Sequence, residues 1–189
     1  MNRTKLAIVD TFWQLLEEKS YHKITVQDIV DRCQVNRNTF YYHFQDIPSL
    51  AEWSVEIWAD AVIKNRGVLE SPANCISYMA EECTKRKTAL LHLYRSAKKE
   101  FFLGYLNKIA EHVIHSYVET KEGYLTFDEE KTKILMKYYK CTLIGILLDW
   151  MESDASYDLI AFCENFCELL AGSGENAFLR CVISRENHA

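Results

Sequence analysis

Hydrophobic and polar residues alternate with helical periodicity in the first third of the chain. A stripe with i, i+3, i+4 and i+7 spacing consists of Val26, Ile29, Val30 and Cys33. Such a stripe is typical of a short amphipathic helix that packs on one side. Thr25 lies where an N-cap is expected, and Asp28 follows three residues later. Because this hydroxyl and this carboxylate can each bond an unpaired amide of the first turn, the pattern predicts a helix that begins directly after Thr25.

A second short helix is predicted after a connection at Gln34 and Val35. Asn36 is a suitable N-cap, and the inward side chains of this helix are Phe40 and Phe44. The opposite face carries Arg37, Asn38, Thr39, Tyr42 and His43. Two short helices joined by a tight turn form a helix-turn-helix, whose second helix presents its N-terminus to the DNA major groove. Arginine can bind guanine O6 and N7, asparagine can bind adenine, and threonine, tyrosine and histidine can donate to phosphates.

This region resembles the DNA-binding head of the TetR family of bacterial transcriptional regulators. The resemblance extends over residues 5–60, and the residues that carry it are Thr25 to Val30, Val35, Thr39 to Phe44 and Leu50. It implies an all-α protein with a three-helix helix-turn-helix head and a helical-bundle body that binds an effector and forms a homodimer. Together with the polar face of the second helix, it gives a predicted DNA-binding set of Thr25, Gln27, Asn36, Arg37, Asn38, Thr39, Tyr41, Tyr42 and His43.

Two residues depart from the pattern of that family. The family usually has glycine in the turn, where the backbone is left-handed, and Gln34 stands there in this chain at a cost of about 1 kcal/mol. The family tends to have lysine near the start of the fourth helix, where it reaches a phosphate, and this chain has Ile47. We therefore expect a strained turn and one fewer contact with the DNA backbone.

Helical periodicity continues along the remaining sequence, which predicts an all-α protein with two domains. Residues 1–48 are predicted to be the DNA-binding domain, which a first helix from Thr4 completes with Trp13 in its core. Residues 49–189 are the predicted regulatory and dimerisation domain, and a fourth helix over residues 46–66 links the two. Further helices are expected over 72–86, from Thr88 onward, between 90 and 118, over 128–151 and over 157–170.

The last two predicted long helices have wide apolar faces that one small helical body can hardly bury alone. The predicted dimer interface consists of Leu143, Leu147, Leu159, Phe162 and Phe166. The alternative is that all of these side chains lie in the core of a single chain. The resemblance favours the dimer, since members of that family dimerise through their last two long helices. Two heads about one DNA turn apart would also add their binding energies.

Aromatic residues in the body are candidates for an effector pocket. They are Tyr78, Tyr94, Phe101, Phe102, Tyr105, Tyr138 and Trp150, and they would serve equally well as core. His112, His115 and Glu119 share a helix face, which permits a metal site, although an exposed polar face explains them better. No catalytic constellation stands out, so we expect no enzymatic activity, no cofactor and no bound metal.

The composition is that of an ordinary globular protein, and a soluble protein of the cytoplasm is expected because neither a membrane-spanning run nor a leader pattern is found. No apolar run approaches the roughly 20 residues that cross a bilayer, so no membrane association is expected. Seven cysteines at irregular spacing indicate reduced thiols. A thiol sensor at Cys163 and Cys167 is conceivable, but two small buried apolar residues are the simpler interpretation. Residues 1–50 contain six basic and six acidic residues, so the rest of the chain carries the whole net charge of −5. This neutral head predicts modest non-specific DNA affinity.

The sequence thus predicts a homodimeric, ligand-responsive repressor that binds double-stranded operator DNA and an unidentified small-molecule effector. The alternative is a protein-interaction module of the same fold with weak or lost DNA binding. Gln34, Ile47 and the neutral head favour this alternative slightly.

Overall fold

The computed structural model describes residues 3–64, 72–96 and 128–172, together with short runs between 103 and 118 and between 176 and 182. The described secondary structure is helical apart from a single bridge residue, which confirms the all-α prediction. In chain order the elements are α1 (Arg3–Glu18), the 3₁₀ helix η1 (Tyr21–Lys23), α2 (Val26–Cys33), α3 (Arg37–His43), α4 (Ile47–Lys64), α5 (Pro72–Lys85), α6 (Lys87–Ser96), α8 (Glu129–Glu152) and α9 (Leu159–Leu169).

The chain forms two compact units. One consists of residues 1–62 and 83–105, and the other of residues 63–82 and 106–189. The unit that contains the helix-turn-helix therefore extends beyond residue 48, since most of α4 and all of α6 belong to it. The functional division between residues 48 and 49 stays a prediction.

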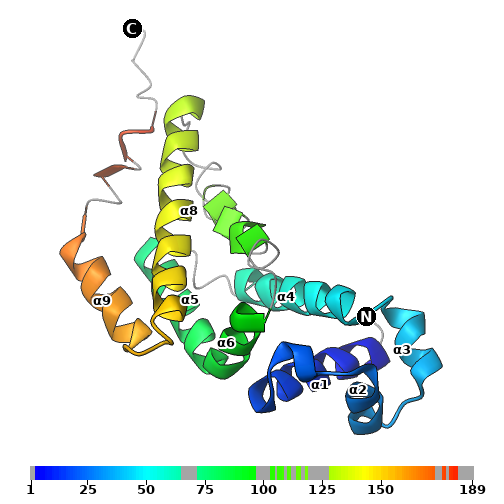
Figure 1. Cartoon of the computed structure of the whole chain (residues 1–189). Coiled ribbons are helices and arrows are strands. Elements are labelled where there is room, and N and C mark those ends of the chain that lie inside the picture. Colours follow the sequence, from blue (N-terminus) through cyan, green and yellow to red (C-terminus); the bar gives the residue numbers. More distant parts are fainter. Residues whose placement is uncertain are drawn as a thin grey trace, which may run out of the picture. The chain divides into compact units, whose positions relative to one another are not determined.

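In the first unit α1 contacts both α2 and α6, and α2 contacts α3 (Figure 1). The fully buried side chains of this unit include Ile8, Phe12 and Leu16 of α1, Ile29 of α2 and Phe40 of α3. These residues are spaced at helical intervals, so each short amphipathic helix contributes one apolar face to the same core. Because α2 and α3, with 8 and 7 residues, are too short to be stable alone in water, the shared core is what holds them.

Helix α6 packs against α1 and η1. The Nδ1 atom of His92 on α6 lies 2.7 Å from the carbonyl oxygen of Leu16 near the end of α1. Because a carbonyl can only accept, this ring nitrogen is the donor. A segment far along the chain thus closes the helix-turn-helix unit on its α1 side.

Trp13 was predicted to be core and is only half-buried. Its ring packs edge-on against the ring of Trp58 on α4 at 6.2 Å. The guanidinium of Arg86, between α5 and α6, lies 5.5 Å from the Trp13 ring centroid and 5.6 Å from that of Trp58. The Trp13 indole therefore lies at the edge of the core, and the Arg86 guanidinium packs near its ring in a cation–π contact.

In the second unit, α8 and α9 follow one another through a short connection (Figure 1). Asp154 and Ala155 have positive φ values of 59° and 52°, which ends α8. The indole N–H of Trp150 donates to the carbonyl oxygen of Tyr157 at 3.1 Å, and Asp158 then caps α9 through the amides of residues 160 and 161. The predicted helices over 128–151 and 157–170 are confirmed within one or two residues, as expected for helix ends.

The turn between α2 and α3 is left-handed, as the resemblance implied. Gln34 has φ 56° and ψ 39°, a conformation in which a side chain crowds the backbone. The turn nevertheless keeps its hydrogen bonds, since the amide of Val35 donates to the carbonyl of Val30 at 3.0 Å. The expected strained turn is therefore present.

Replacing Gln34 by glycine is expected to stabilise the protein by roughly 0.5 to 1 kcal/mol. Glycine relieves the left-handed strain, while its greater freedom in the unfolded chain offsets part of the gain. Urea unfolding of the Gln34→Gly variant measures the change. As a control, Gln14→Gly in the exposed middle of α1 should destabilise by about 1 kcal/mol. A loss of stability in Gln34→Gly would mean that the glutamine side chain makes a compensating interaction.

Candidate nucleic-acid interface

Both helices of the helix-turn-helix begin with side-chain caps. The Thr25 hydroxyl accepts from the Asp28 amide at 3.2 Å, and the Thr25 amide donates to the Asp28 carboxylate at 2.8 Å, which completes the predicted capping box. The Asn36 side-chain oxygen accepts from the amide of Thr39 at 2.8 Å and from its hydroxyl at 3.0 Å. Since each cap satisfies amides that a short helix leaves unpaired, both helix starts are fixed locally.

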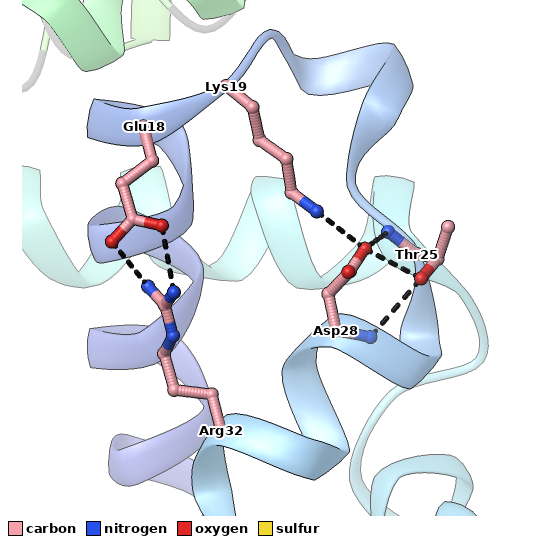
Figure 2. A network of polar contacts seen from close by, with 5 residues as sticks. All are labelled: Glu18, Lys19, Thr25, Asp28 and Arg32. Carbon is pink, nitrogen blue, oxygen red and sulfur yellow. Dashed lines mark hydrogen bonds and ion pairs between the residues drawn. The ribbon is translucent and has the colours of Figure 1, made fainter.

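Two ion pairs join α2 to the end of α1, and Figure 2 shows them together with the capping box. Arg32 donates through both terminal nitrogens to the two carboxylate oxygens of Glu18, each at 2.8 Å. Lys19 lies 2.8 Å from the carboxylate of Asp28. Hydrogen bonds from Lys19 and from Thr25 lower the pKa of Asp28 from 3.8 to about 2. The carboxylate that caps α2 is thus also the residue that ties α2 to α1.

Helix α3 is held from its inner side by aromatic residues. Phe40 and Phe44 are 0% and 4% exposed, and their ring centroids lie 6.0 Å apart. The Phe44 ring also meets Trp53 of α4 edge-on at 5.9 Å. The ammonium group of Lys5 on α1 lies 3.8 Å from the Trp53 ring centroid and 5.2 Å from that of Phe44. Residues from α1 and α4 therefore help to determine where the outer face of α3 points.

That outer face is polar and aromatic. Arg37 and Asn38 are exposed in its first turn, and Tyr41 and Tyr42 are 54% and 82% exposed. His43 is half-buried, and its ring meets that of Tyr42 edge-on at 4.9 Å. A fixed helix that presents an arginine, an asparagine and tyrosine hydroxyls has the donors that read base edges and bind phosphates.

Arg37 is linked to α2 by hydrogen bonds. Its Nε donates to the side-chain oxygen of Gln27 at 2.9 Å. The side-chain nitrogen of Gln27 in turn donates to the carboxylate of Asp31 at 2.5 Å. Asp31 was not among the predicted site residues. Its position one helical turn after Gln27, on the same face, is the sequence signal that would have identified it.

The structure divides the predicted DNA-binding residues into two groups. Thr25, Asn36 and Thr39 use side-chain oxygens in the caps of α2 and α3, and Gln27 bonds Arg37. The residues that present side chains outward from α3 are Arg37, Asn38, Tyr41, Tyr42 and, in part, His43. A direct DNA contact for each of the nine residues stays a prediction.

Only four of the seven predicted effector-pocket residues lie in the described part of the chain, and these four differ in how far they are buried. Phe101, Phe102 and Tyr105 lie outside the described residues, as do His112 and Glu119 of the predicted polar face. Tyr78 and Tyr94 are half-buried, whereas Tyr138 is 54% exposed. Trp150 is 1% exposed, and its N–H is used by the Tyr157 carbonyl, which favours a role in the core for this residue.

The predicted dimer residues differ in how much surface they offer. Phe162 is 42% exposed, while Phe166, Leu143 and Leu147 are half-buried. Leu159 is only 3% exposed, so its side chain already belongs to the core of a single chain and offers little area to a partner. The large apolar side chains with the highest exposed fractions on α8 and α9 are instead Ile134 at 71%, Tyr138 at 54% and Leu169 at 83%.

The two thiols of α9 do not have the properties of a sensor. Burial raises the pKa of Cys163 to about 11 and also raises the pKa of Cys167. Because the thiolate is the reactive form, such thiols are unreactive near neutral pH. Within the described part of the chain, no group of three metal-binding side chains is found, and no helix is both long and apolar enough to cross a bilayer.

The chain contains a capped helix-turn-helix whose second helix is exposed and rich in hydrogen-bond donors, and its described elements are helices. These features define a DNA-binding transcriptional regulator. Residues 8–52 match the family described as bacterial regulatory proteins, tetR family, and residues 70–172 match its transcriptional regulator C-terminal region. The second match covers more than half of the chain. The protein belongs to the TetR family of bacterial transcriptional regulators.

Relatives agree with this membership. The dhaKLM operon transcriptional activator DhaS of Lactococcus lactis is 36% identical over 53 residues, 28% of each chain. The uncharacterized regulator YxbF of Bacillus subtilis is 23% identical over 175 residues, which cover 89% of this chain and 44% of YxbF. The chain therefore spans less than half the length of the curated relatives it matches.

Solved structures share the fold. A dihydroxyacetone kinase operon activator DhaS superposes with a TM-score of 0.70 at 19% identity, over 92% of this chain and 97% of that one. FadR of Bacillus subtilis, solved in complex with stearoyl-CoA, superposes with a TM-score of 0.62 at 17% identity, over 88% and 97% of the two chains.

Stability at low pH should depend on Asp28. Its folded-state pKa of about 2 lies below its ordinary value of 3.8, so the unfolded chain binds this proton more tightly. The contribution of the carboxylate is therefore present above pH 4 and is lost as the pH falls toward 2. We expect Asp28→Asn to lower the free energy of unfolding by about 1 kcal/mol at pH 6.

Urea unfolding of both proteins at pH 6, 4, 3 and 2 measures this difference, which should shrink toward the lowest pH. Asp10→Asn, which changes an exposed aspartate of α1, is the matched control and should cost less than about 0.5 kcal/mol at pH 6. A difference between wild type and Asp28→Asn that stays constant over this range would contradict the lowered pKa.

Proposed function

We propose that this protein is a homodimeric repressor that binds operator DNA through α3 and is released by a small-molecule effector. The observation that carries the proposal is the outer face of α3, where Arg37, Asn38, Tyr41 and Tyr42 are exposed on a helix fixed by its caps and by buried aromatics. Arg37 and Asn38 are assigned to base edges. Tyr42 and His43 are assigned to phosphates, which position the helix in the groove.

Two exposed apolar stripes support the homodimer. On α8, Ile134, Tyr138, Cys141 and Gly145 are all exposed and recur at i, i+4, i+7 and i+11, so they share one face. On α9, Phe162, Phe166 and Leu169 recur at i, i+4 and i+7, and the first two rings stack at 6.4 Å. Large apolar side chains that are exposed in line on two consecutive helices are typical of a surface that a partner covers, and a second copy is the simplest partner.

An effector would act by binding the DNA-competent and DNA-incompetent forms with different affinities. The body residues 49–189 are the assigned regulatory part, with α4 as the link to the DNA-binding domain. Family membership and the stearoyl-CoA bound to a structural relative support a ligand-responsive body. As a DNA-binding regulator, the protein is proposed to act in the cytoplasm.

Activation of transcription is a second candidate. It is favoured by the relative DhaS, named a transcriptional activator, which is 36% identical to this chain over 53 residues. In vitro transcription from a promoter that contains the selected operator separates the two, because a repressor lowers and an activator raises the amount of transcript. The other alternative, a protein-interaction module with weak or lost DNA binding, predicts that DNA sequences are enriched weakly or not at all.

Selection from random double-stranded DNA is expected to enrich one operator with two half-sites about one helical turn apart. On that operator, Arg37→Ala should weaken binding by about 1 to 3 kcal/mol per half-site and should relax the preference at one base pair. Affinities of the operator and of its single base-pair variants, at fixed salt, measure both effects.

The control is Arg32→Ala on the same helix-turn-helix, since the guanidinium of Arg32 is bonded bidentately to Glu18. Base-pair preference should be unchanged in this variant. If Arg37→Ala weakens binding equally on all DNA sequences, Arg37 contacts phosphate and does not read a base.

Replacing Phe162 by lysine should convert the dimer to monomers at micromolar concentration, because a charge would then be buried against the apolar stripe of the partner. Sedimentation velocity of wild type and variant measures the change. Glu164→Lys adds a lysine to the opposite, exposed face of α9 and should leave the dimer intact. An unchanged dimer in Phe162→Lys would show that this face is not the interface.

A further inference from the structure

The hydrogen bonds between α2 and α3 are arranged in a definite chemical order. The carboxylate of Asp31 can only accept, the guanidinium of Arg37 can only donate, and the amide of Gln27 lies between them. Only one orientation of the amide satisfies both neighbours, with its nitrogen toward Asp31 and its oxygen toward Arg37. Asp31 thereby determines that Gln27 presents an acceptor to the arginine.

This arrangement selects how Arg37 can meet DNA. A guanidinium can bind two acceptors either through Nε and one terminal nitrogen or through its two terminal nitrogens. Gln27 occupies Nε at 2.9 Å, which excludes the first mode while the bond lasts. The two terminal nitrogens remain directed away from the bonded edge, in the geometry that binds guanine O6 and N7.

The bond also restricts a flexible side chain. An exposed arginine loses conformational entropy when it is ordered by a ligand, and a side chain already held in its bound geometry loses less. Because Arg37 is ordered before DNA binds, it should bind most tightly the base whose two acceptors match its held orientation. Bases that require another orientation of the guanidinium should bind less tightly.

We propose that Gln27 and Asp31 are positioning residues that set the preference of Arg37 for guanine. The proposal rests on the proposed function, namely sequence-specific DNA binding through α3. It differs from a direct contact of Gln27 with the sugar-phosphate backbone, because the glutamine now acts through Arg37. Asp31 contributes orientation although its negative charge opposes the approach of DNA.

The experiment uses the full-length protein, the operator that wild type selects from random DNA and the single variants of that operator. Gln27→Leu should reduce the preference for guanine at the Arg37 position by about two- to tenfold. In an Arg37→Ala background, the same substitution should have almost no effect on base preference. This non-additivity in a double-mutant cycle indicates that Gln27 acts through Arg37.

Two variants of Asp31 separate orientation from charge. Asp31→Leu should lose the guanine preference as Gln27→Leu does, whereas Asp31→Asn keeps an acceptor for the amide and should retain the preference. Both remove one negative charge near the phosphates, so both should raise affinity for all sequences at low salt. Gln14→Leu on α1 is the matched control, and its effect should be additive with Arg37→Ala.

The outcomes distinguish the inference from the function on which it rests. Enrichment of no DNA sequence would overturn the proposed function, and the positioning role with it. If an operator is enriched but Gln27→Leu and Arg37→Ala are additive, or if Gln27→Leu weakens all sequences equally, then Gln27 contacts phosphate directly and the positioning role is wrong. Thermal unfolding of each variant verifies that differences in preference do not reflect unfolding.

Discussion

The carboxylate of Asp28 is the group on which the arrangement of the helix-turn-helix depends. It accepts from the Thr25 amide and from Lys19, so it caps α2 and joins that helix to the end of α1 at once. An eight-residue helix is too short to be stable by its own hydrogen bonds. Its position must therefore come from its cap and from contacts with neighbours. Because α3 begins only a few residues after α2 ends, the position of α2 constrains the position of α3.

The recognition surface combines a rigid inner side with an accessible outer side. Phe40 and Phe44, on the inner side of α3, are buried, and the Lys5 ammonium lies over the Trp53 ring. Helices that precede and follow α3 in the sequence therefore hold α3 in place. The polar side chains on the outside are then presented by a backbone that does not need to reorganise. Such preorganisation matters more in a head with balanced charge, since general attraction to phosphate contributes less there.

The head and the body have surfaces of different chemical character. The head must leave donors exposed for DNA, whereas the stripes on α8 and α9 leave large apolar side chains exposed, with Ile134 and Leu169 at 71% and 83%. Isolated apolar residues on a surface need no explanation, but aligned residues on two consecutive helices do. The proposed homodimer would cover these stripes, and it would also double the number of heads that bind one DNA molecule.

The sequence by itself determined the local features of this protein. Helix starts at Thr25, Asn36 and Asp128 depend on interactions within about four residues, which capping rules describe. The left-handed turn at Gln34 was expected from the resemblance to the TetR family. Tertiary structure decided what depends on distant partners. Arg32 meets Glu18 across 14 residues, and His92 meets Leu16 across 76. The tertiary structure also decided that Leu159 is buried and Ile134 is exposed. Both are apolar residues on amphipathic helices, so the sequence pattern does not distinguish them, and only the neighbouring elements determine which one is covered.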